Sequence, residues 1–370
     1  MPLGPLDDLL AHQTPDTFDH VATSDRNFYD RYYFNCHPCS DELFLITGMG
    51  QYPNLGTTDV FVAVSMGRMH YVVRASRELG VDRLDTTIGP FGVEVIEGLR
   101  RLRVWLEPTE HDVAFDLTFR GSVPCLEEPV TFRRHGARVS DHTSRFAQVG
   151  TWEGRLSVAD KTFEVTPERW KGARDHSWGV RPIGEPEPLG IRRKWLSAPQ
   201  GFFHNWLPMQ FDDFMLKVFI QEDLDGNRIL EEAARVPNFG RDEPIVQLGS
   251  PWHRFAYKPG TREIARAEFG FAHSDLTVTS IPLRTNYLCA GSGYRPGPDW
   301  AHGMYHGPLV VQGLRFDMGD PAVFATMQGL NETLCRFELS TGEIGYGMHE
   351  NACAGIYRPY GFDTVDAVAG

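Results

Sequence analysis

The sequence predicts an all-β protein made of antiparallel strands. Apolar and polar residues alternate along much of the chain, for example over 113–119, where Val113, Phe115 and Leu117 alternate with polar or small residues. Alternation with a period of two is typical of strands that turn one face to a core and the other to water. Glycine and proline account for 37 and 25 of the 370 residues, which is enough for many tight turns. No amphipathic helix longer than about four turns is visible, so helices contribute little to the expected fold.

The N-terminal half begins with an arm, residues 1–24, in which one short helix is expected around 6–12. An aromatic segment follows at 27–34. A tight turn at 66–68 joins two strands into a hairpin, and Gly98 separates two more. Strands are therefore expected at 43–49, 59–65, 69–76, 91–97, 102–107 and 113–119.

The C-terminal half continues this pattern without a visible short repeat. A hairpin is expected where 213–221 and 228–235 flank a turn. Further strands are expected at 264–271, 276–281, 313–318, 322–327, 332–340 and 345–351. The stretch Pro-Asn-Phe-Gly at 237–240 interrupts the strands, so a domain boundary is expected between residues 236 and 237. The arm at 1–24 then precedes a first domain at 25–236 and a second domain at 237–370.

The composition disfavours several classes of partner. The formal net charge of −13 argues against nucleic acid and against anionic membranes, because both attract basic surfaces. No stretch has the apolar length of a membrane span. The first residues lack the basic and apolar pattern of a signal peptide, so a cytoplasmic protein is expected. The six cysteines are too scattered for a disulfide framework, and Cys36 and Cys39 are interpreted as ordinary thiols.

Neither a metal nor an organic cofactor is expected. His302 and His306 have the spacing of a helical metal pair, but glycines and a proline around them disfavour a helix. No glycine pattern typical of a nucleotide site is present. Glu94, Glu97 and Asp116 alternate with apolar residues, so they either line a barrel lumen or face solvent, and the solvent face is favoured.

The densest group of reactive side chains is the stretch Gly-Ala-Arg-Asp-His-Ser-Trp-Gly-Val-Arg at 172–181. On a strand, Arg174, His176 and Trp178 share one face, and Asp175 lies on the other. One interpretation is a buried polar network that closes a barrel, since ion-pair networks also concentrate such groups. The other is a functional site in which an imidazole points into a cavity with an aromatic wall.

The motif Arg-Asp-His-Ser-Trp-Gly-x-Arg, with tryptophans downstream, resembles the hallmark of the AttH-like and carotenoid 1,2-hydratase (hydroxyneurosporene synthase) superfamily. The resemblance implies two lipocalin-like antiparallel β-barrel domains in tandem. For the hydratase branch it implies an acid–base cluster made of the His and Trp of this motif and a Tyr-x-Asp nearly thirty residues later. His176 and Trp178 match that pattern, whereas Phe203 and Asn205 stand where the family has the phenol and the carboxylic acid.

Together the motif and the resemblance predict a cofactor-independent enzyme that hydrates, isomerises or cyclises a hydrophobic small molecule such as a terpenoid, steroid or polyketide. His176, assisted by Asp175, is the expected acid–base group, and aromatic rings are expected to stabilise positive charge. The residues expected to bind the substrate are Arg174, Trp178, Arg181, Trp195, Phe203, Asn205 and Trp206. One alternative is a carrier that binds such a molecule without transforming it. Another is that the motif only joins the two barrels.

The motif also carries an electrostatic prediction. Asp175 is adjacent to Arg174 and precedes Arg181, so opposite charge should lower the pKa of its carboxyl group. A hydrogen bond between Asp175 and His176 would fix the imidazole tautomer. Because adjacent strand residues point to opposite faces, that contact requires a bulge or a bend at Gly179.

Overall fold

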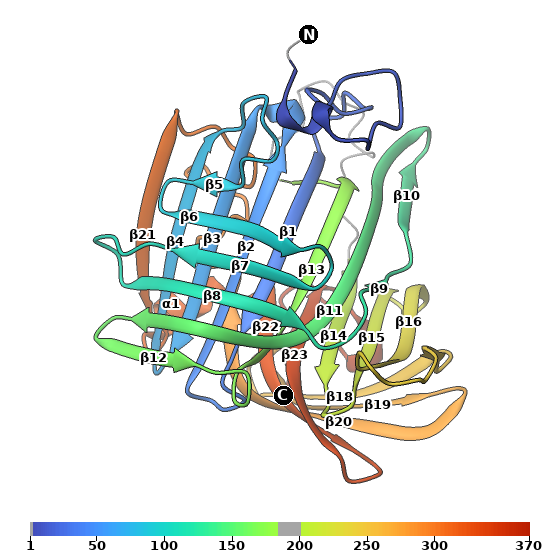
Figure 1. Ribbon diagram of the computed structural model, residues 1–370. Helices are drawn as coiled ribbons and strands as arrows, with labels where there is room; N and C mark the ends of the chain where they lie inside the picture. Colours follow the sequence, from blue (N-terminus) through green and yellow to red (C-terminus); the bar gives the residue numbers. More distant parts are fainter. Residues whose placement is uncertain (1–2, 184–200) are drawn as a thin grey trace.

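The computed structural model describes residues 3–183 and 201–370, and its regular structure is almost wholly β (Figure 1). The described strands form two antiparallel sheets. One has 14 strands and curls into a nearly closed barrel, and the other has nine strands and forms a half-barrel. The predicted all-β antiparallel fold is therefore confirmed.

The first sheet combines the strands of the N-terminal half with one strand of the C-terminal half. Its main path runs in the order β21-β4-β3-β2-β1-β13-β11-β8-β7-β6-β5, and β9, β10 and β12 each pair with β11. Its strands are β1 (Phe28–Cys36), β2 (Leu43–Tyr52), β3 (Thr57–Met66), β4 (Met69–Glu78), β5 (Thr87–Ile88), β6 (Phe91–Glu97), β7 (Arg101–Leu106), β8 (Val113–Gly121), β9 (Leu126–Glu127), β10 (Thr131–His135), β11 (Arg138–Val158), β12 (Lys161–Val165), β13 (Lys171–Val180) and β21 (Leu309–Asp317).

The long strand β11 carries the first sheet around a corner. Its first part pairs with β13 and its second part with β8, and in Figure 1 strands β5–β8 cross over β1–β4. Gly154, in the second part, has a φ of 135°, and a Cβ atom there would lie 2.1 Å from the carbonyl oxygen of Asp116. Only glycine fits so close an approach to the neighbouring strand β8, and this φ also favours glycine.

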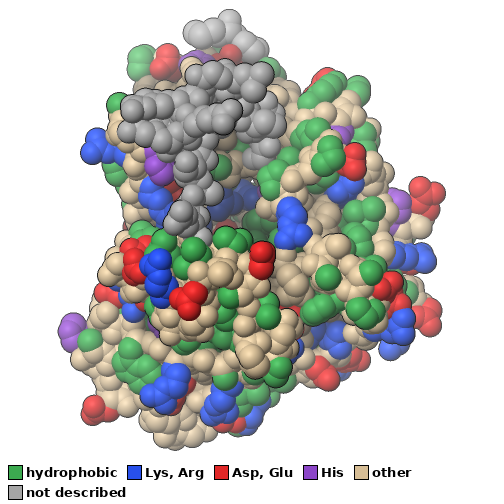
Figure 2. Space-filling view, turned by 180° about the vertical axis from the view of Figure 1, so that it is seen from behind, with side chains coloured by type: hydrophobic (Ala, Val, Ile, Leu, Met, Phe, Trp, Pro, Cys, Tyr) green, Lys and Arg blue, Asp and Glu red, His purple; other side chains and the backbone are tan. Residues whose placement is uncertain are grey.

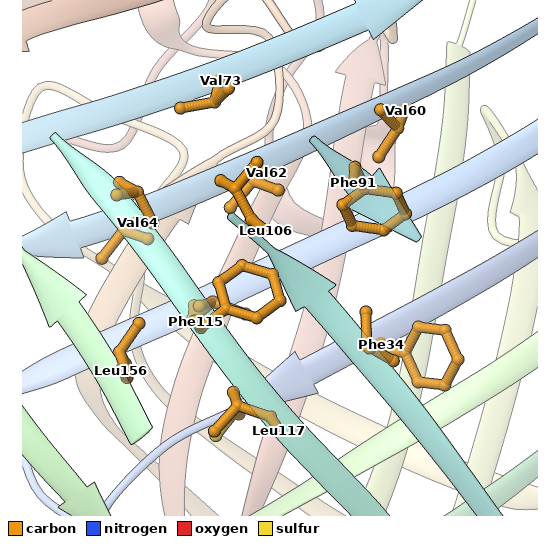
Figure 3. Packing of buried hydrophobic residues seen from close by; sticks show 14 of the residues in the cluster. Phe34, Val60, Val62, Val64, Val73, Phe91, Leu106, Phe115, Leu117 and Leu156 are labelled. Atoms are coloured by element: carbon orange, nitrogen blue, oxygen red, sulfur yellow. The ribbon is translucent and has the colours of Figure 1, made fainter. Parts of the chain in front are cut away.

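Apolar side chains from both layers fill much of the lumen of the first barrel. Phe34 of β1 and Val62 of β3 belong to the same buried cluster as Phe115 and Leu117 of β8 (Figure 3). Phe115 and Leu117 are among the residues that the period-two alternation assigned to a single face. Burial of that face stabilises the barrel by roughly 25 cal/mol for each Å² of apolar surface removed from water.

The second sheet follows the order β17-β16-β15-β14-β23-β22-β20-β19-β18. One of its faces carries an aromatic core in which Phe203 stacks on Tyr357 with ring centroids 4.5 Å apart. Its strands are β14 (Gly201–Gln210), β15 (Phe214–Asp223), β16 (Arg228–Pro237), β17 (Val246–Gln247), β18 (Pro251–Tyr257), β19 (Ile264–Phe271), β20 (Ser274–Tyr287), β22 (Asn331–Leu339) and β23 (Ile344–Gly355).

A third apolar cluster joins the two sheets. Tyr33 and Phe61 contribute to it from the first sheet, and Trp206 and Met348 from the second. In addition, β21 pairs with β4 along its whole length, although it comes from the C-terminal half of the chain. The two halves therefore share both a core and a sheet.

The chain changes from the first sheet to the second after β13 and before β14, and not at the boundary expected between residues 236 and 237. Residue 236 lies within β16, which pairs with β15. The Pro-Asn-Phe-Gly stretch ends a strand of the second sheet, because proline and glycine mark strand ends as readily as domain boundaries. Strand pairing thus places 201–237 with the second sheet, and the division at 25–236 and 237–370 stays a prediction about folding units.

One predicted strand is a helix. Residues 322–327 belong to α1 (Pro321–Met327), whose N-cap Asp320 accepts a hydrogen bond from the backbone N–H of Ala322 at 2.9 Å. An Asp-Pro pair starts helices well, and this local signal outweighs the apolar alternation that favoured a strand. The other short elements are 3-10 helices, namely η1 (Pro5–Asp8), η2 (Pro53–Leu55) and η4 (Arg358–Tyr360). Within the described ranges, no helix is long and apolar enough to cross a membrane.

Candidate functional site

A cavity of about 600 Å³ lies between the two sheets. Strands β1, β10, β11 and β13 of the first sheet, strands β14, β22 and β23 of the second, and the loop at 288–308 contribute to its walls. On the face drawn in Figure 2 a hollow opens near the middle of the molecule, and basic and hydrophobic side chains are visible inside it. A cavity of this size accommodates a small organic molecule.

Strand β13 presents Asp175 to this cavity, as the alternation of the strand requires. The nearest ion-pair partner of Asp175 is Arg145 of β11, whose Nε lies 3.8 Å from Oδ2. Burial raises the pKa of Asp175 to about 6, and the attraction of Arg145 offsets only part of this effect. The predicted lowering of this pKa is therefore wrong. Arg174 points to the other face of the strand, so it does not pair with Asp175.

A buried ion-pair network continues from Arg145 into the interface of the sheets. Glu128 lies 3.5 Å from Arg145 and 3.0 Å from the Nζ of Lys217, a side chain with no exposed surface. The indole N–H of Trp206 donates a further hydrogen bond to Glu128. Of these residues the sequence predicted only Trp206, because nothing in the local patterns brings β9, β11 and β15 together.

Two further carboxyl groups face the cavity from adjacent strands of the second sheet. Glu332 of β22 and Glu350 of β23 are direct cross-strand partners. Burial, and then the negative charges of Glu350 and Asp175, raise the pKa of Glu332 well above its ordinary value. The Oε2 atom of Glu332 is buried and has no hydrogen-bond partner within residues 3–183 and 201–370.

Glu350 is in the opposite state. Burial alone would raise its pKa, but His204, whose Nε2 lies 3.1 Å from Oε1, together with Arg145 and Arg181, more than offsets burial and the net shift is downward. Two like charges so close cannot both ionise easily, and unequal surroundings decide which carboxyl keeps its proton. The cavity therefore holds Glu332 as an acid beside Glu350 as a carboxylate. The sequence placed both residues on strands but gave no sign that the strands would pair.

His176 faces away from this cavity. Its Nε2 lies 2.7 Å from Oδ1 of Asp30 on β1, and Oδ2 of Asp30 lies 3.3 Å from Nη2 of Arg83. These groups border a separate pocket of about 310 Å³ on the lumen side of the first sheet, where the ring of Tyr32 lies 4.6 Å from the imidazole. The expected aromatic surroundings are present, but the partner of the imidazole is Asp30 and not Asp175.

Regular strand geometry explains this separation. Strand β13 keeps its register with β1 and β11 from Arg174 to Val180, without a shift at Gly179. No bulge therefore turns His176 toward Asp175. Trp178 lies on the same face as His176, with ring centroids 5.4 Å apart, and is 39% exposed.

The remaining predicted residues are divided among several environments. Arg181 and Trp206 line the cavity between the sheets. Arg174 is buried, and its Nε donates to Oε1 of Gln148 at 2.8 Å. Trp195 lies outside the described residues.

Phe203 and Asn205 belong to the core of the second sheet and do not approach the motif. Oδ1 of Asn205 lies 2.9 Å from both Nε2 of His349 and Nδ2 of Asn351. The four positions that correspond to the hydratase acid–base cluster are thus not brought together, because two lie at the lumen of the first barrel and two in the core of the second sheet.

The described residues include no group of three or more metal-ligating side chains. His302 lies in a loop that lines the cavity between the sheets, and His306 stacks on Trp300 with ring centroids 4.2 Å apart. Glu94, Glu97 and Asp116 are exposed, as favoured from the sequence, and Asp116 accepts hydrogen bonds from Arg103 at 2.8 Å.

Two barrel-like antiparallel sheets with a polar cavity between them define a tandem lipocalin-like fold, and comparisons of structure confirm this fold. A putative AttH from Nitrosomonas europaea aligns with a TM-score of 0.53 at 13% identity, over 93% of this chain and 98% of that one. CghA with Sch210972 aligns with a TM-score of 0.51 at 12% identity, over 93% and 90% of the two chains. Kievitone hydratase from Nectria haematococca aligns with a TM-score of 0.46 at 12% identity, over 88% and 89%.

A comparison of the sequence with models of protein families identifies the family of this chain. Residues 3–363 match the model of a family described as a family of unknown function (DUF8625), and the chain belongs to that family. Among curated proteins, none matches this sequence. The likeness to the solved structures, at 12–13% identity, concerns the fold.

Proposed function

We propose that the protein is a cofactor-independent lyase or isomerase that acts on a small molecule in the cavity between its sheets. One observation carries this proposal: Glu332 is a buried carboxylic acid with an unpartnered Oε2, in the same cavity as the carboxylates of Glu350 and Asp175. Acids and bases whose pKa values are pushed apart by their surroundings are the usual parts of proton-transfer catalysis.

The roles follow from the protonation states. Glu332 donates its proton to a double bond or to a departing hydroxyl group of the substrate. Asp175, with a pKa of about 6, is a base suited to neutral pH and takes up a proton from a neighbouring C–H group or from a water molecule that adds. Hydration, dehydration, isomerisation and proton-started cyclisation all consist of these two transfers, and none moves electrons to an external acceptor.

The walls favour a substrate that is hydrophobic in part and also bears polar groups. Phe202, Trp206 and Leu330 offer apolar surface, whereas Arg31, Arg133 and Arg145 are among the charged groups around them. A purely hydrocarbon ligand would remove water from these charged groups and offer them no hydrogen bonds, at a cost of several kcal/mol. An oxygenated terpenoid, steroid or polyketide satisfies both kinds of surface. One solved structure of similar fold, CghA, is described with the small molecule Sch210972.

A carrier is the second candidate, because a cavity of about 600 Å³ is large enough to enclose a ligand without reacting with it. Incubation of the purified protein with a small-molecule extract, without added cofactor, separates the two candidates by mass spectrometry. An enzyme of this kind produces new species that differ from a consumed one by one water or that share its mass at another retention time. A carrier enriches a species on the protein and leaves it unchanged.

The control is the Glu332→Gln variant, which keeps the shape of the side chain and removes the transferable proton. If wild type and this variant transform the same species at the same rate, Glu332 is not the acid and the proposal fails. The cytoplasmic location expected from the sequence remains part of the proposal.

A further inference from the structure

The cavity between the sheets contains a buried arginine that pairs with no carboxylate of the described residues. Arg31 of β1 is 4% exposed, and its Nε has no hydrogen-bond partner. One of its terminal nitrogens lies 2.9 Å from Nε2 of His302, and its guanidinium lies 4.7 Å from the ring centroid of Tyr294. Buried charges are ordinarily paired, because removal of an ion from water costs several kcal/mol. A buried guanidinium in a cavity wall without an ion pair is therefore suited to bind an anionic group of a ligand.

The acidic residue nearest to this arginine is already engaged. Asp59 lies behind His302, with its Oδ1 3.7 Å from Nδ1 of that ring. Oδ1 also accepts from the hydroxyl of Tyr52 at 3.1 Å, and Oδ2 accepts from the backbone N–H of Gly303 at 2.7 Å. Burial, and then the positive charge of Arg31, lowers the pKa of His302 to about 4, so the ring between the two charges is neutral.

A second arginine in the same wall, Arg181, also has no ion-pair partner among the described residues, although it attracts the carboxyl groups of Asp175 and Glu350 from a longer distance. Arg181 follows directly after β13, and its guanidinium lies 4.6 Å from the ring centroid of Tyr29. In the part of the chain that the structure describes, no ion pair joins Arg181 or Arg31 to a carboxylate. Both arginines line the cavity together with Tyr294 and His302.

The other charges of the cavity have partners of their own. Asp175 faces Arg145 and Glu350 faces His204. Arg133 donates a hydrogen bond to Oε1 of Gln221, and Asp141 accepts one from the hydroxyl of Thr143. Among the described residues, Arg31 and Arg181 are thus the cavity arginines whose side chains contact no carboxylate or amide oxygen, and they provide donors for one small oxyanion.

From this geometry we propose that the substrate carries a carboxylate group, which is bound by Arg31 and Arg181 at the wall formed by Tyr294 and His302. Two guanidinium groups match the two oxygens of one carboxylate, each of which accepts more than one hydrogen bond. A doubly charged phosphate fits less well, because Asp175 and Glu350 also line the cavity and repel a second negative charge. The carboxylate anchors the molecule, while the rest of it extends along the cavity toward Glu332.

This inference rests on the proposed function, since it concerns the ligand of the same cavity, but its test requires no turnover. The probe is a library of carboxylic acids with one to three rings, in which each acid is accompanied by its primary amide. The protein is incubated with this library, and mass spectrometry identifies the compounds that it retains. Wild-type protein should retain acids over the matching amides by about tenfold or more, the factor expected for hydrogen bonds to a charged group. Arg31→Gln and Arg181→Gln should each reduce that preference toward one.

Arg83→Gln is the matched control, because Arg83 borders the other pocket, and it should retain the preference. If Arg31→Gln does not fold, as judged by circular dichroism, the half-buried Arg181 provides the deciding variant. The inference is wrong if acids and amides are retained equally, if no acid is retained, or if the arginine variants keep the preference. If inorganic phosphate displaces the retained acids more effectively than benzoate does, the site selects phosphate and the carboxylate assignment fails. If the protein retains acids but transforms none of them, the proposed enzymatic function is contradicted, whereas the proposed carboxylate-binding site is supported.

Discussion

The two faces of strand β13 place neighbouring residues of one motif in contrasting surroundings. On the lumen side, His176 and Asp30 form a pair whose side chains are 24% and 35% exposed. On the cavity side, the side chain of Asp175 is 17% exposed and Glu332 across the cavity is 1% exposed. Water therefore screens the first pair more strongly than it screens the charges on the cavity side.

This difference shows that proximity in sequence says little about shared chemistry on a strand. Because water screens its charges, a partly exposed ion pair typically contributes less than about 1 kcal/mol to the stability of the folded state. Buried carboxyl groups shift one another's pKa values strongly, and such shifts are characteristic of functional sites. The motif drew attention to His176, but the buried carboxyl groups with raised pKa values, Asp175 and Glu332, face the cavity between the sheets.

The largest expected effect is on catalysis. With the substrate found by the profiling experiment, Glu332→Gln should reduce turnover by about 10²–10⁴-fold, the usual contribution of a positioned acid. His176→Gln should change turnover by less than about threefold, because this ring faces the other pocket. Steady-state kinetics of both variants provides the measurement. If His176→Gln reduces turnover more than Glu332→Gln does, the catalytic groups lie on the lumen side of β13.

The next effect is on stability at the cavity side. Lys217→Met should lower the free energy of unfolding by about 3–5 kcal/mol, because it leaves the buried carboxylate of Glu128 with less compensation. Urea denaturation at pH 7.5 gives the value. The double variant Lys217→Met, Glu128→Gln should recover part of the loss, since it also removes the uncompensated charge. Equal losses for the single and double variants would show that lost packing, and not charge, dominates.

A pH-dependent effect of intermediate size is expected at Asp175. Its pKa is about 6 in the folded protein, against an ordinary value of 3.8. The folded state therefore binds the proton more tightly, so wild type loses stability as the pH rises from about 4 to 6, by roughly 3 kcal/mol in total. Asp175→Asn cannot lose a proton, so its stability relative to wild type should rise across this interval and then level off.

Thermal and urea unfolding of both proteins between pH 3.5 and 8 measures this difference. Parallel pH profiles for wild type and Asp175→Asn would show that burial does not raise this pKa. A lower melting temperature for the variant at pH 7.5 would instead favour the interpretation that the motif mainly joins the two barrels.

The smallest effect is expected on the lumen side. Asp30→Asn should lower the free energy of unfolding by less than about 1 kcal/mol, and this loss should shrink further in 1 M salt, because its ion pair with His176 is partly exposed. Urea denaturation at low and high salt provides the comparison. A loss of several kcal/mol that salt does not change would mean that the two faces of β13 are electrostatically alike.

Local patterns predicted much of the fold because strand alternation is a local property. The residues Val113, Phe115 and Leu117 that alternate in sequence are all buried on one face of β8. The face assignment within the motif is confirmed for the same reason. The strand expected at 322–327 is wrong because a short apolar run fits a strand or a helix equally well, and the Asp-Pro start decided in favour of α1.

The candidate site was only partly predictable. Asp175, Arg181 and Trp206 were expected and line the cavity between the sheets, whereas Glu332 and Arg31 were not expected. Nothing beside Glu332 or Arg31 in the sequence distinguishes them from other charged residues on strands. Their significance comes from partners far along the chain, such as His302, which is 271 residues from Arg31.

By itself the sequence determined where many of the strands lie, which side chains share a face of β13, and the resemblance that indicated the AttH-like fold. The tertiary structure alone decided which pocket each face meets, which carboxyl group keeps its proton, and which arginines are left without partners. The physical reason is that alternation and turns depend on neighbouring residues, whereas burial and electrostatic interaction depend on distances in space. Glu332, Glu350 and Asp175 come from three strands, and only the packing of the two sheets brings them to one cavity.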